Sequence, residues 1–512
     1  MKSKDYMQER LKTMKKRATT ADKVKKQETV STERLCEIRN GELIRYYGED
    51  AEFVIPERVT AIAAGAFRNC KKLTDVVIGK QVTTIRREAF RDCTHLKRVT
   101  LPSCLREIGD SAFRGCSSLV SLILPRAVKT VGASAFRDCT ALKSAVLSTG
   151  LIHLGEYAFA GCTSLEDVTV SDTLSVIREG VFFRCTSLKA IQIPDSVNTV
   201  GSYVFGQCTA LEQIVLTDSI SYIGRGAFSE CHALRSFSAP RRLQFFANYL
   251  FCGCSALEEV EVSDSVTAIG NYAFCGCKSL KRIAIPQNVT KIGQGSFLHC
   301  SNLARVDLPN SLGSLGRQAF AYCTALETVR FNGGIAAIES ECFAKCVQLK
   351  SIQLPNSITA IEEKAFYRCI SLEKLQLSDS LRKIGERAFE ECALVSLSMP
   401  ESISVIGNYA FANCYWLNTF ILPNHRLTLG QSVFSGCAGL EVLVVPDRYL
   451  RRWRRRERLS IQGETQFVSH GELQLTLYLS ELGSSDTPLE RKKAICESIR
   501  SQVKDLKRRH IL

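Results

Sequence analysis

Cysteine is the residue type whose number and spacing in this chain most resemble a chemical site. The sequence holds 23 cysteines, and 17 of them recur at one position of a repeat. Thiolates at this density could bind zinc, pair as disulfides or act as a redox store. Two neighbouring C-x-C motifs, Cys252/Cys254 and Cys275/Cys277, could bring four sulfur atoms together and are the best candidate for a metal site.

The interval between the cysteines argues against a metal array. Each of the 17 follows a phenylalanine by three residues, and these phenylalanines run from Phe67 to Phe389 in steps of 23, then to Phe411 and Phe434 after one step of 22. Side chains stacked at one repeat position point in parallel and do not converge four at a time on an ion. Parallel Cβ vectors also suit disulfides poorly. We therefore expect buried thiols that act as small apolar side chains, each with a weak hydrogen bond to a turn carbonyl, and no metal or cofactor.

Common catalytic motifs are missing from the sequence. It has no H-E-x-x-H, G-x-S-x-G or G-x-x-x-x-G-K-[ST] pattern, and the histidines inside the repeats occur at differing phases. No run of 18 apolar residues predicts a transmembrane helix, and no apolar segment near the start predicts secretion. The sequence therefore predicts a non-enzymatic protein located in the cytoplasm.

A 23-residue unit must position all of these residues. In the typical unit 264–286, an L-x-x-I-x-I motif that begins at Leu280 has the two-residue period of a strand. Pro286 has no amide donor and ends that strand, and 11 of the 12 prolines occupy this position. Gly270 marks a second turn. Glycine stands there in 11 of 17 units, so a backbone conformation open only to glycine is not needed.

Stacked copies of the unit predict a solenoid rather than several globular domains. One unit cannot enclose a core, whereas neighbours can bury their Phe, Leu, Ile and Ala positions as continuous columns. At ~4.8 Å per coil, the 17 coils would extend for roughly 80 Å. The step of 22 arises because one residue is missing after Cys392, which predicts a kink or a shortened turn at 392–395.

The repeat resembles a known family. The pattern I-G-x-x-A-F-x-x-C-x-x-L-x-x-V-x-L-P, of which residues 108–125 and 292–309 are close copies, is similar to the BspA-like (Treponema pallidum-type) leucine-rich repeat. The resemblance covers about residues 36–446. It implies a right-handed leucine-rich repeat solenoid, with a parallel β-sheet on one face and turns and short segments on the other. Family members are generally adhesion or protein-binding scaffolds, so the resemblance implies a protein partner and brings no catalytic site.

The two ends of the chain differ from the repeats. The formal net charge is +15, and residues 1–35 and 447–512 contribute +6 each. Apolar residues at steps of four and three predict a basic helix in the first segment, and a capping box at Thr487 predicts a helix in the last. Alternation over 473–479 predicts a closing strand or hairpin. We thus expect a basic N-terminal helix, a solenoid over 36–446, and a basic C-terminal cap with a helical tail.

An arginine-rich segment, residues 448–459, contains Tyr449 and Trp453. Such a run could bind nucleic acid or an anionic membrane surface, or it could cap the last coil with Trp453 turned inward. The arginines available to an anionic partner are Arg451, Arg452, Arg454, Arg455 and Arg456. Binding of an anionic polymer or membrane surface, through 448–458 and the basic N-terminal helix, is therefore the alternative function.

The outward face of the predicted strands is the preferred candidate site. In L-x-x-V-x-L the residues between the apolar positions point away from the core, and a solenoid demands no particular residue there. A group of charged residues occupies this face in the middle of the repeats. Its members are Glu259, Glu261, Arg282, Arg305, Asp307 and Arg330. We predict a protein-binding surface here, with a solvated and unselected polar face as the alternative.

Overall fold

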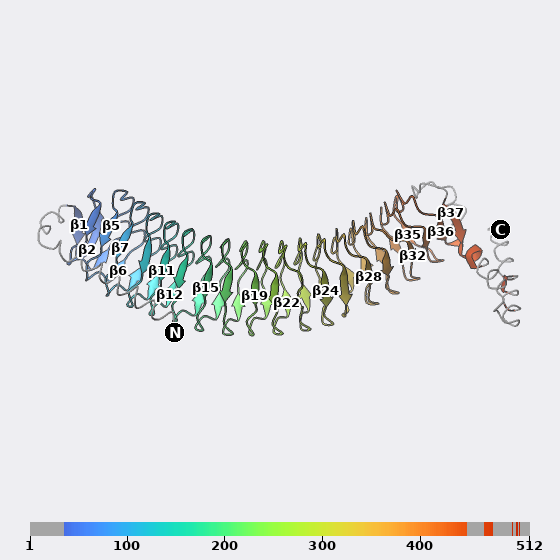
Figure 1. Ribbon diagram of the computed structural model, residues 1–512, viewed down its shortest axis with the longest axis horizontal. Coiled ribbons are helices and arrows are strands. Elements are labelled where there is room, and N and C mark those ends of the chain that lie inside the picture. Colours follow the sequence, from blue (N-terminus) through green and yellow to red (C-terminus); the bar gives the residue numbers. More distant parts are fainter. Residues whose placement is uncertain (1–34, 448–464, 475–493, 495–497, 500, 502–512) are drawn as a thin grey trace. The chain divides into compact units, whose positions relative to one another are not determined.

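The computed structural model describes residues 35–447, 465–474, 494, 498–499 and 501. They fall into two compact units, a first unit that ends at Val197 and a second unit that begins at Asn198. Each unit is a β-solenoid made of the 23-residue coils that the sequence predicts (Figure 1). Within the described residues, no helix is long and apolar enough to cross a membrane.

The first unit begins with a hairpin and continues as alternating strands of three and two residues. Its strands are β1 (Cys36–Arg39), β2 (Glu42–Tyr46), β3 (Glu52–Val54), β4 (Ala61–Ile62), β5 (Asp75–Val77), β6 (Thr84–Ile85), β7 (Arg98–Thr100), β8 (Glu107–Ile108), β9 (Ser121–Ile123), β10 (Thr130–Val131), β11 (Ser144–Val146), β12 (His153–Leu154), β13 (Asp167–Thr169), β14 (Val176–Ile177) and β15 (Ala190–Gln192). Strand β1 pairs antiparallel with β2. The ladders β2-β4-β6-β8-β10-β12, β3-β5-β7 and β9-β11-β13 are parallel.

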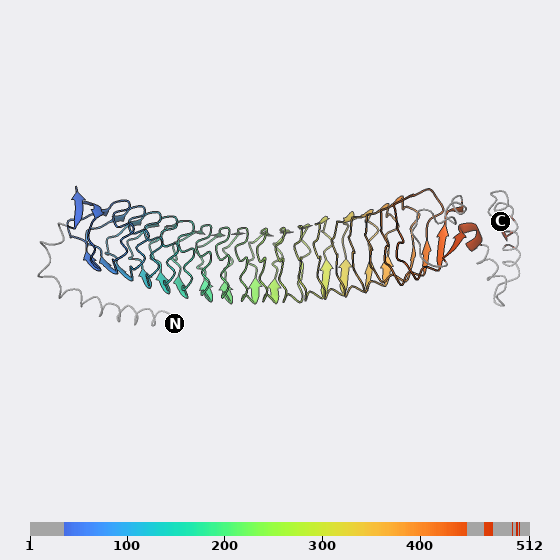
Figure 2. The same cartoon turned by 90° about the horizontal axis from the view of Figure 1, so that it is seen from above.

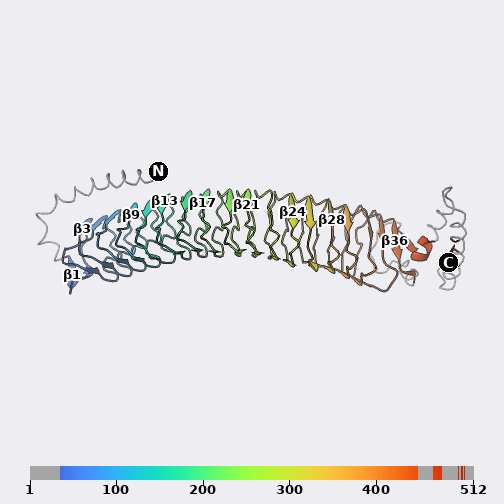
Figure 3. The same ribbon diagram turned by 90° about the horizontal axis from the view of Figure 1, so that it is seen from below.

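The second unit has a similar alternation, but four of its longer strands have four residues, and the coil between β22 and β23 has only an isolated bridge at Arg282 in place of a longer strand. Its strands are β16 (Thr199–Val200), β17 (Gln213–Val215), β18 (Tyr222–Ile223), β19 (Ser236–Ser238), β20 (Phe245–Phe246), β21 (Glu259–Glu261), β22 (Ala268–Ile269), β23 (Lys291–Ile292), β24 (Arg305–Leu308), β25 (Ser314–Leu315), β26 (Thr328–Phe331), β27 (Ala337–Ile338), β28 (Ser351–Gln353), β29 (Ala360–Ile361), β30 (Lys374–Gln376), β31 (Lys383–Ile384), β32 (Ser396–Ser398), β33 (Val405–Ile406), β34 (Thr419–Ile421), β35 (Thr428–Leu429), β36 (Val442–Val445) and β37 (Gln466–Ser469). Figure 3 shows β21, β24, β28 and β36 along the same side of this unit.

The two-residue strands are a feature that the sequence pattern did not reveal. We predicted one strand per coil and only short segments on the far side, but those segments pair in register as a second parallel ladder. In the second unit, for example, Ala268 pairs with Lys291 and Ile269 with Ile292. A strand of two residues is too short to show a period, and only the stacking of coils reveals it.

The predicted phenylalanine columns form the core of each unit. Phe113, Phe228 and Phe343 are all fully buried. In the first unit the rings of Phe113 and Phe136 stack with centroids 5.3 Å apart, and in the second unit those of Phe297 and Phe320 lie 5.1 Å apart. Figure 2 shows the regular spacing of the coils that brings these rings together. The prediction that single coils share a continuous core is confirmed within each unit.

The chain around each phenylalanine is held by a third set of bonds between coils. In the first unit the amides of Gly65, Phe67 and Asn69 donate forward to carbonyls of the next coil, with N···O distances of 3.0, 2.7 and 2.9 Å. Every second amide in this segment therefore points toward the next coil. The backbone adopts a positive φ two residues before and two residues after the phenylalanine to allow this. Glu88 and Asp92 adopt it at 57° and 58° beside Phe90, although neither is glycine.

The glycine position of the repeat has a different requirement. As predicted, its φ is not in the left-handed region, but a Cβ on Gly155 would lie 2.3 Å from the backbone nitrogen of Ala133 in the preceding coil. The amide of Gly155 donates backward to the carbonyl of Val131 at 2.8 Å. Glycine is therefore favoured here because the coils approach closely, not because of its backbone freedom.

The shortened turn predicted at 392–395 is present. After Cys392 the chain passes to β32 without the two-residue turn that follows the cysteine of other coils. Lys383 consequently pairs with Val405, 22 residues away, in the ladder of two-residue strands. The omission shortens a surface turn and leaves the core intact, because Leu394 and Leu397 stay buried.

The described C-terminal residues extend the ladder of three-residue strands. Strand β37 pairs parallel with β36, and residues 470–474 then form a helical turn. The strand predicted over 473–479 is wrong for residues 473 and 474, and the rest of it lies outside the described residues. Ala494, Ser498, Ile499 and Ser501 are helical, and the rest of the predicted helical tail lies outside the described residues. The predicted N-terminal helix lies outside the described residues.

Candidate functional site

The longer strand of a coil, of three or four residues, turns its first and third side chains outward, where they are exposed or partly exposed. In β21 Val260 is buried between exposed Glu259 and Glu261, and in β24 Val306 is buried between exposed Arg305 and Asp307. The prediction that the residues between the apolar positions face outward is confirmed for these strands. A row of side chains that the core does not constrain therefore lines this side of the second unit.

In the last coil the L-x-x-V-x-L motif that begins at Leu440 places Val442 and Val444 outward, and for Val444 this prediction is wrong. Val444 of β36 is only 1% exposed. Strand β37, which comes from outside the repeat, pairs alongside β36 and places Val468 opposite Val444. The repeat pattern holds no information about this added strand, so the open face ends before β36.

The structure brings the six predicted charged residues together on neighbouring coils. Arg282 forms a parallel bridge with Arg305, and Asp307 pairs in register with Arg330 between β24 and β26. Arg282 Nη2 lies 3.6 Å from Glu259 Oε1 in the coil before it. We call this set the charged cluster: Glu259, Glu261, Arg282, Arg305, Asp307 and Arg330.

Ion pairs within the charged cluster balance its charges. Arg305 contacts both carboxylate oxygens of Asp307, with Nη2–Oδ2 at 2.9 Å, and Arg330 Nε lies 3.9 Å from Asp307 Oδ1. The hydroxyl of Ser238 donates to Glu261 at 2.8 Å. Three acidic and three basic side chains leave the cluster without net charge. Because the side chains of Glu259 and Arg282 are 69% and 83% exposed, their ion pair adds little stability and can be exchanged for contacts with a partner.

An exposed apolar group on the second unit was missed in the sequence. Ile370, Tyr415 and Trp416 occupy the turn that follows the core cysteine and are 56%, 58% and 71% exposed, and Val395 lies at the start of the adjoining strand region. Most other coils carry serine, threonine or another polar residue directly after the cysteine. The change from a polar to an apolar residue at this position could have revealed the group from the sequence. It occurs in the coils before and after the shortened turn.

The cysteine column has the predicted structural role. Cys116 Sγ donates to the carbonyl of Phe90 at 3.1 Å, and Cys369 Sγ donates to that of Phe343 at 3.2 Å. Burial raises the pKa of the Cys369 thiol to about 12, so the side chain stays protonated and donates. These thiols act as small core side chains that each bond one carbonyl of the preceding coil.

The C-x-C group does not gather its four sulfur atoms. Cys254 and Cys277 point into the core and donate to the carbonyls of Phe228 and Phe251. Cys252 and Cys275 are half-buried and hydrogen-bonded to each other. Over the described part of the chain, no group of three or more His, Cys, Asp or Glu side chains is placed to hold a metal ion. The structure therefore gives no support to the metal site considered for this group.

Histidines of the repeats are engaged separately. His232 Nδ1 lies 2.9 Å from the carbonyl of Gly253, and His425 Nε2 lies 2.7 Å from that of Glu401. The ring of His299 lies tilted against that of Tyr322 with centroids 4.4 Å apart, and burial lowers the pKa of His299. These side chains occupy separate places and do not form a shared site. The predicted anionic site, Arg451 to Arg456, lies outside the described residues.

A repeated coil with parallel strand ladders and an aligned phenylalanine core defines the class of leucine-rich repeat solenoids. The sequence pattern described as BspA type leucine-rich repeat region (6 copies) matches residues 46–164, 129–258, 246–352 and 336–451. The chain belongs to this family. Leucine-rich repeat proteins of this kind are generally scaffolds that bind protein partners. The matched family is not a family of enzymes.

Several solved bacterial structures are similar to the chain. A leucine-rich repeat protein from Bacteroides ovatus ATCC 8483 has 26% identity, with 84% of this chain and 94% of that chain covered and a TM-score of 0.43. A T. pallidum leucine-rich repeat protein has 30% identity over 33% of this chain and 82% of that one, with a TM-score of 0.31. A leucine-rich cell surface protein from Faecalibacterium prausnitzii A2-165 has 26% identity over 75% and 91%, with a TM-score of 0.37. No curated relative matches the chain.

Proposed function

We propose that this protein is a non-enzymatic scaffold that binds a protein partner through the outward face of its three-residue strands. The observation that carries the proposal is the charged cluster, whose six exposed side chains come from four consecutive coils. A solenoid core requires none of them. Membership of the leucine-rich repeat family supports the same general role.

The balance of charges favours a protein over an anionic polymer at this face. A polyanion would meet the carboxylates of Glu259, Glu261 and Asp307 as well as the arginines. A protein that carries both acidic and basic side chains can instead exchange ion pairs with the cluster, which fixes register and speeds association. Val215, two coils before Glu261 on the same row, is 56% exposed and adds an apolar contact.

Charge reversal tests the proposal. The tagged full chain and its E259K/E261K variant are used to capture proteins from extract of the source cells, and captured proteins are quantified by mass spectrometry. We expect at least one protein whose recovery falls about tenfold or more in the variant, because an interfacial charge contributes on the order of 1.4 kcal/mol or more.

The matched control is D379K/E401K. Asp379 and Glu401 are exposed on turns of consecutive coils in the same unit, and the variant changes the net charge by the same amount. It is expected to recover the partner at the wild-type level. The proposal fails if no protein distinguishes the two variants while both unfold thermally at the same temperature as the wild type.

A further inference from the structure

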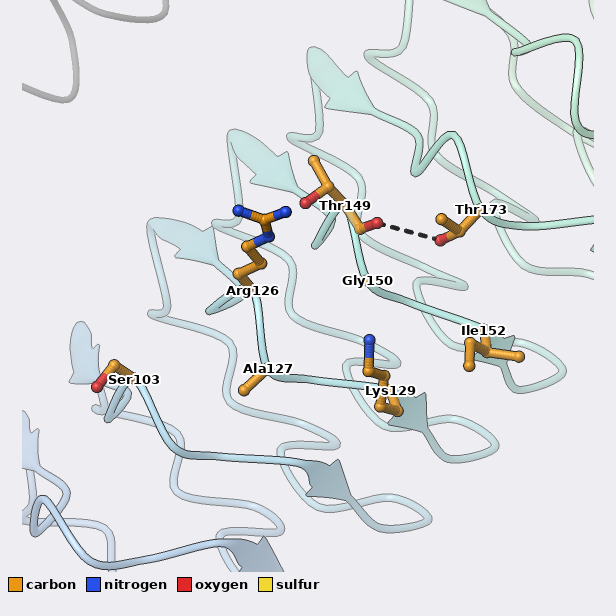
Figure 4. Close-up of a pocket in the computed structure, with 8 residues that line it drawn as sticks. All are labelled: Ser103, Arg126, Ala127, Lys129, Thr149, Gly150, Ile152 and Thr173. Atoms are coloured by element: carbon orange, nitrogen blue, oxygen red, sulfur yellow. Dashed lines mark hydrogen bonds between the residues drawn. The ribbon is translucent and has the colours of Figure 1, made fainter.

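A shallow depression on the first unit lies away from the strand face. It has a volume of about 510 Å³ and is lined by turns of four successive coils. The lining residues are Ser103, Arg126, Ala127, Lys129, Thr149, Gly150, Ile152 and Thr173 (Figure 4). We call it the Arg126–Lys129 groove. Its size falls within the roughly 300–1,000 Å³ that is usual for small-ligand sites.

Two cationic side chains in the groove have no acidic partner. Among the residues that the structure describes, neither Arg126 nor Lys129 makes an ion pair, whereas Arg114 and Arg137 of the same unit contact Asp138. Both Arg126 and Lys129 are exposed. Their charges are therefore available to a ligand rather than used within the fold.

Glycine makes room for one of these cations. A Cβ on Gly150 would lie 2.8 Å from Lys129 Nζ, so the ammonium group lies directly against the Gly150 turn. The backbone carbonyl of Arg106, in the preceding coil, accepts a hydrogen bond from the Lys129 amide at 2.9 Å, and the exposed Arg106 side chain places a third cation near the lining residues. These three cations outnumber the two exposed acids on the same turns, Glu107 and Asp172.

Hydroxyls and an apolar side chain complete the groove. The hydroxyl of Thr173 donates to the carbonyl of Leu151 at 2.7 Å and accepts from the hydroxyl of Ser171 at 2.8 Å, which leaves one further acceptor position on its oxygen. Thr149 and Ser103 add two further hydroxyls, and Ile152 is 53% exposed at one edge. Cations, hydroxyls and one aliphatic surface together match a sugar that carries an acidic group.

Other ligands fit this groove less well. None of its lining residues is aromatic, so it offers no surface on which nucleic-acid bases could stack. An extended peptide would need a free strand edge, but β10 beside the groove is paired with both β8 and β12.

We propose that the Arg126–Lys129 groove binds a sulfated sugar unit of an acidic glycan. The Arg126 guanidinium and the Lys129 ammonium contact the sulfate through charge-assisted hydrogen bonds. The hydroxyls of Ser103, Thr149 and Thr173 meet the sugar hydroxyls, and Ile152 packs against the apolar face of the ring. This site is independent of the charged cluster, which belongs to the second unit.

Calorimetric titration with a heparin-derived tetrasaccharide tests the proposal on the full chain. The R126Q/K129Q variant should bind at least about tenfold more weakly, since it loses two charge-assisted contacts. The control is K97Q/K143Q, which removes two exposed cations of the same unit from a different turn of the coil and should bind within about twofold of wild type. Thermal unfolding of each variant shows that its fold is kept.

Three further results would overturn the proposal. The first is a wild-type chain that does not bind the tetrasaccharide, and the second is an equal loss in both variants, which would show non-specific attraction. The third is equal binding of the desulfated tetrasaccharide or of a glutamate-rich peptide. Equal binding of the desulfated tetrasaccharide would show that the groove does not recognise the sulfate. Equal binding of the glutamate-rich peptide would show that the groove binds a protein ligand.

Discussion

Each core cysteine is positioned by the carbonyl that it bonds. Cys116 donates to the carbonyl of Phe90, and the same contact recurs in coil after coil of each unit. Cys252 and Cys275 stand two residues earlier in their coils and have each other as partners instead. A difference of two positions thus separates a structural thiol from a half-buried, chemically accessible one.

This pair predicts a difference in thiol reactivity with pH. The hydrogen bond from Cys252 stabilises the thiolate of Cys275 and lowers the pKa of Cys275, while the shared contact raises the pKa of Cys252. A lowered pKa means that the thiolate is present at lower pH. Near neutral pH, iodoacetamide should therefore alkylate Cys275 before Cys252, and both before buried Cys254 and Cys277, as measured by peptide mass spectrometry.

Removing the donor tests the cause of that difference. C252A takes the hydrogen bond away and should slow the alkylation of Cys275, whereas C254A leaves the pair intact and should not. Equal alkylation rates at Cys252 and Cys275 in the wild-type chain would contradict the inference that Cys252 keeps its proton and donates it to the thiolate of Cys275.

Among the elements of the fold, the ladder of two-residue strands brings successive coils into close contact at the residue that follows each strand. Where a glycine follows one of these strands, as Gly155 and Gly316 do, it lies against the backbone of the coil before it. A Cβ on Gly316 would lie 2.5 Å from the nitrogen of Gln294, whereas one on Gly313, three residues earlier in the same coil, would meet nothing nearer than 3.8 Å. One coil therefore contains both a crowded and an open glycine.

The two glycines give a matched pair of substitutions. G316A should lower the free energy of unfolding by about 1–3 kcal/mol, because the coils must move apart to admit the methyl group. G313A should change it by no more than about 0.5 kcal/mol in either direction. Urea unfolding measures both values. A G316A variant as stable as G313A would show that the coils separate there without strain.

The sequence predicts an element of this fold only where the residue pattern of that element is long enough to be recognised in many coils. The strands with L-x-x-V-x-L and the phenylalanine column repeat over many coils and were predicted correctly, except in the unit 264–286, where the predicted strand is reduced to a bridge at Arg282. The two-residue strands were not, and neither were the positive φ angles of Glu88 and Asp92, which are imposed by amide bonds between coils. The charged cluster was found because its positions follow the repeat. The Arg126–Lys129 groove was missed, since no single coil contains it.

At the scale of the whole molecule, the repeat makes one coil equivalent to its neighbours within a unit. The phenylalanine of each coil packs against the phenylalanine rings of the coils on either side. Stability therefore depends on keeping the 23-residue spacing that aligns these rings and not on any particular coil. Phe274, Phe297 and Phe320 illustrate this in the second unit, where consecutive rings stack at 5.2 and 5.1 Å.

Deleting one complete coil tests that equivalence. Removal of residues 280–302 joins Ser279 to Leu303 and restores the spacing from Cys277 to the next leucine. We expect a folded chain with cooperative unfolding by circular dichroism. Removal of half a coil, residues 280–291, breaks the phase and should abolish cooperative unfolding of this unit. Similar behaviour of the two deletions would argue against a shared core.

The opposed directions of the bonds between coils have an electrostatic consequence. In the first unit the amide of Phe67 donates forward to Ala89 while the amide of Gly109 donates backward to Ile85. The peptide dipoles of these two sides therefore oppose each other, unlike those of an α-helix, which add up along its axis. Because the two directions offset each other, these bonds do not place at the ends of a stack the partial charge that aligned dipoles place at a helix terminus. Evolution can lengthen such a protein by duplication without having to neutralise its ends again.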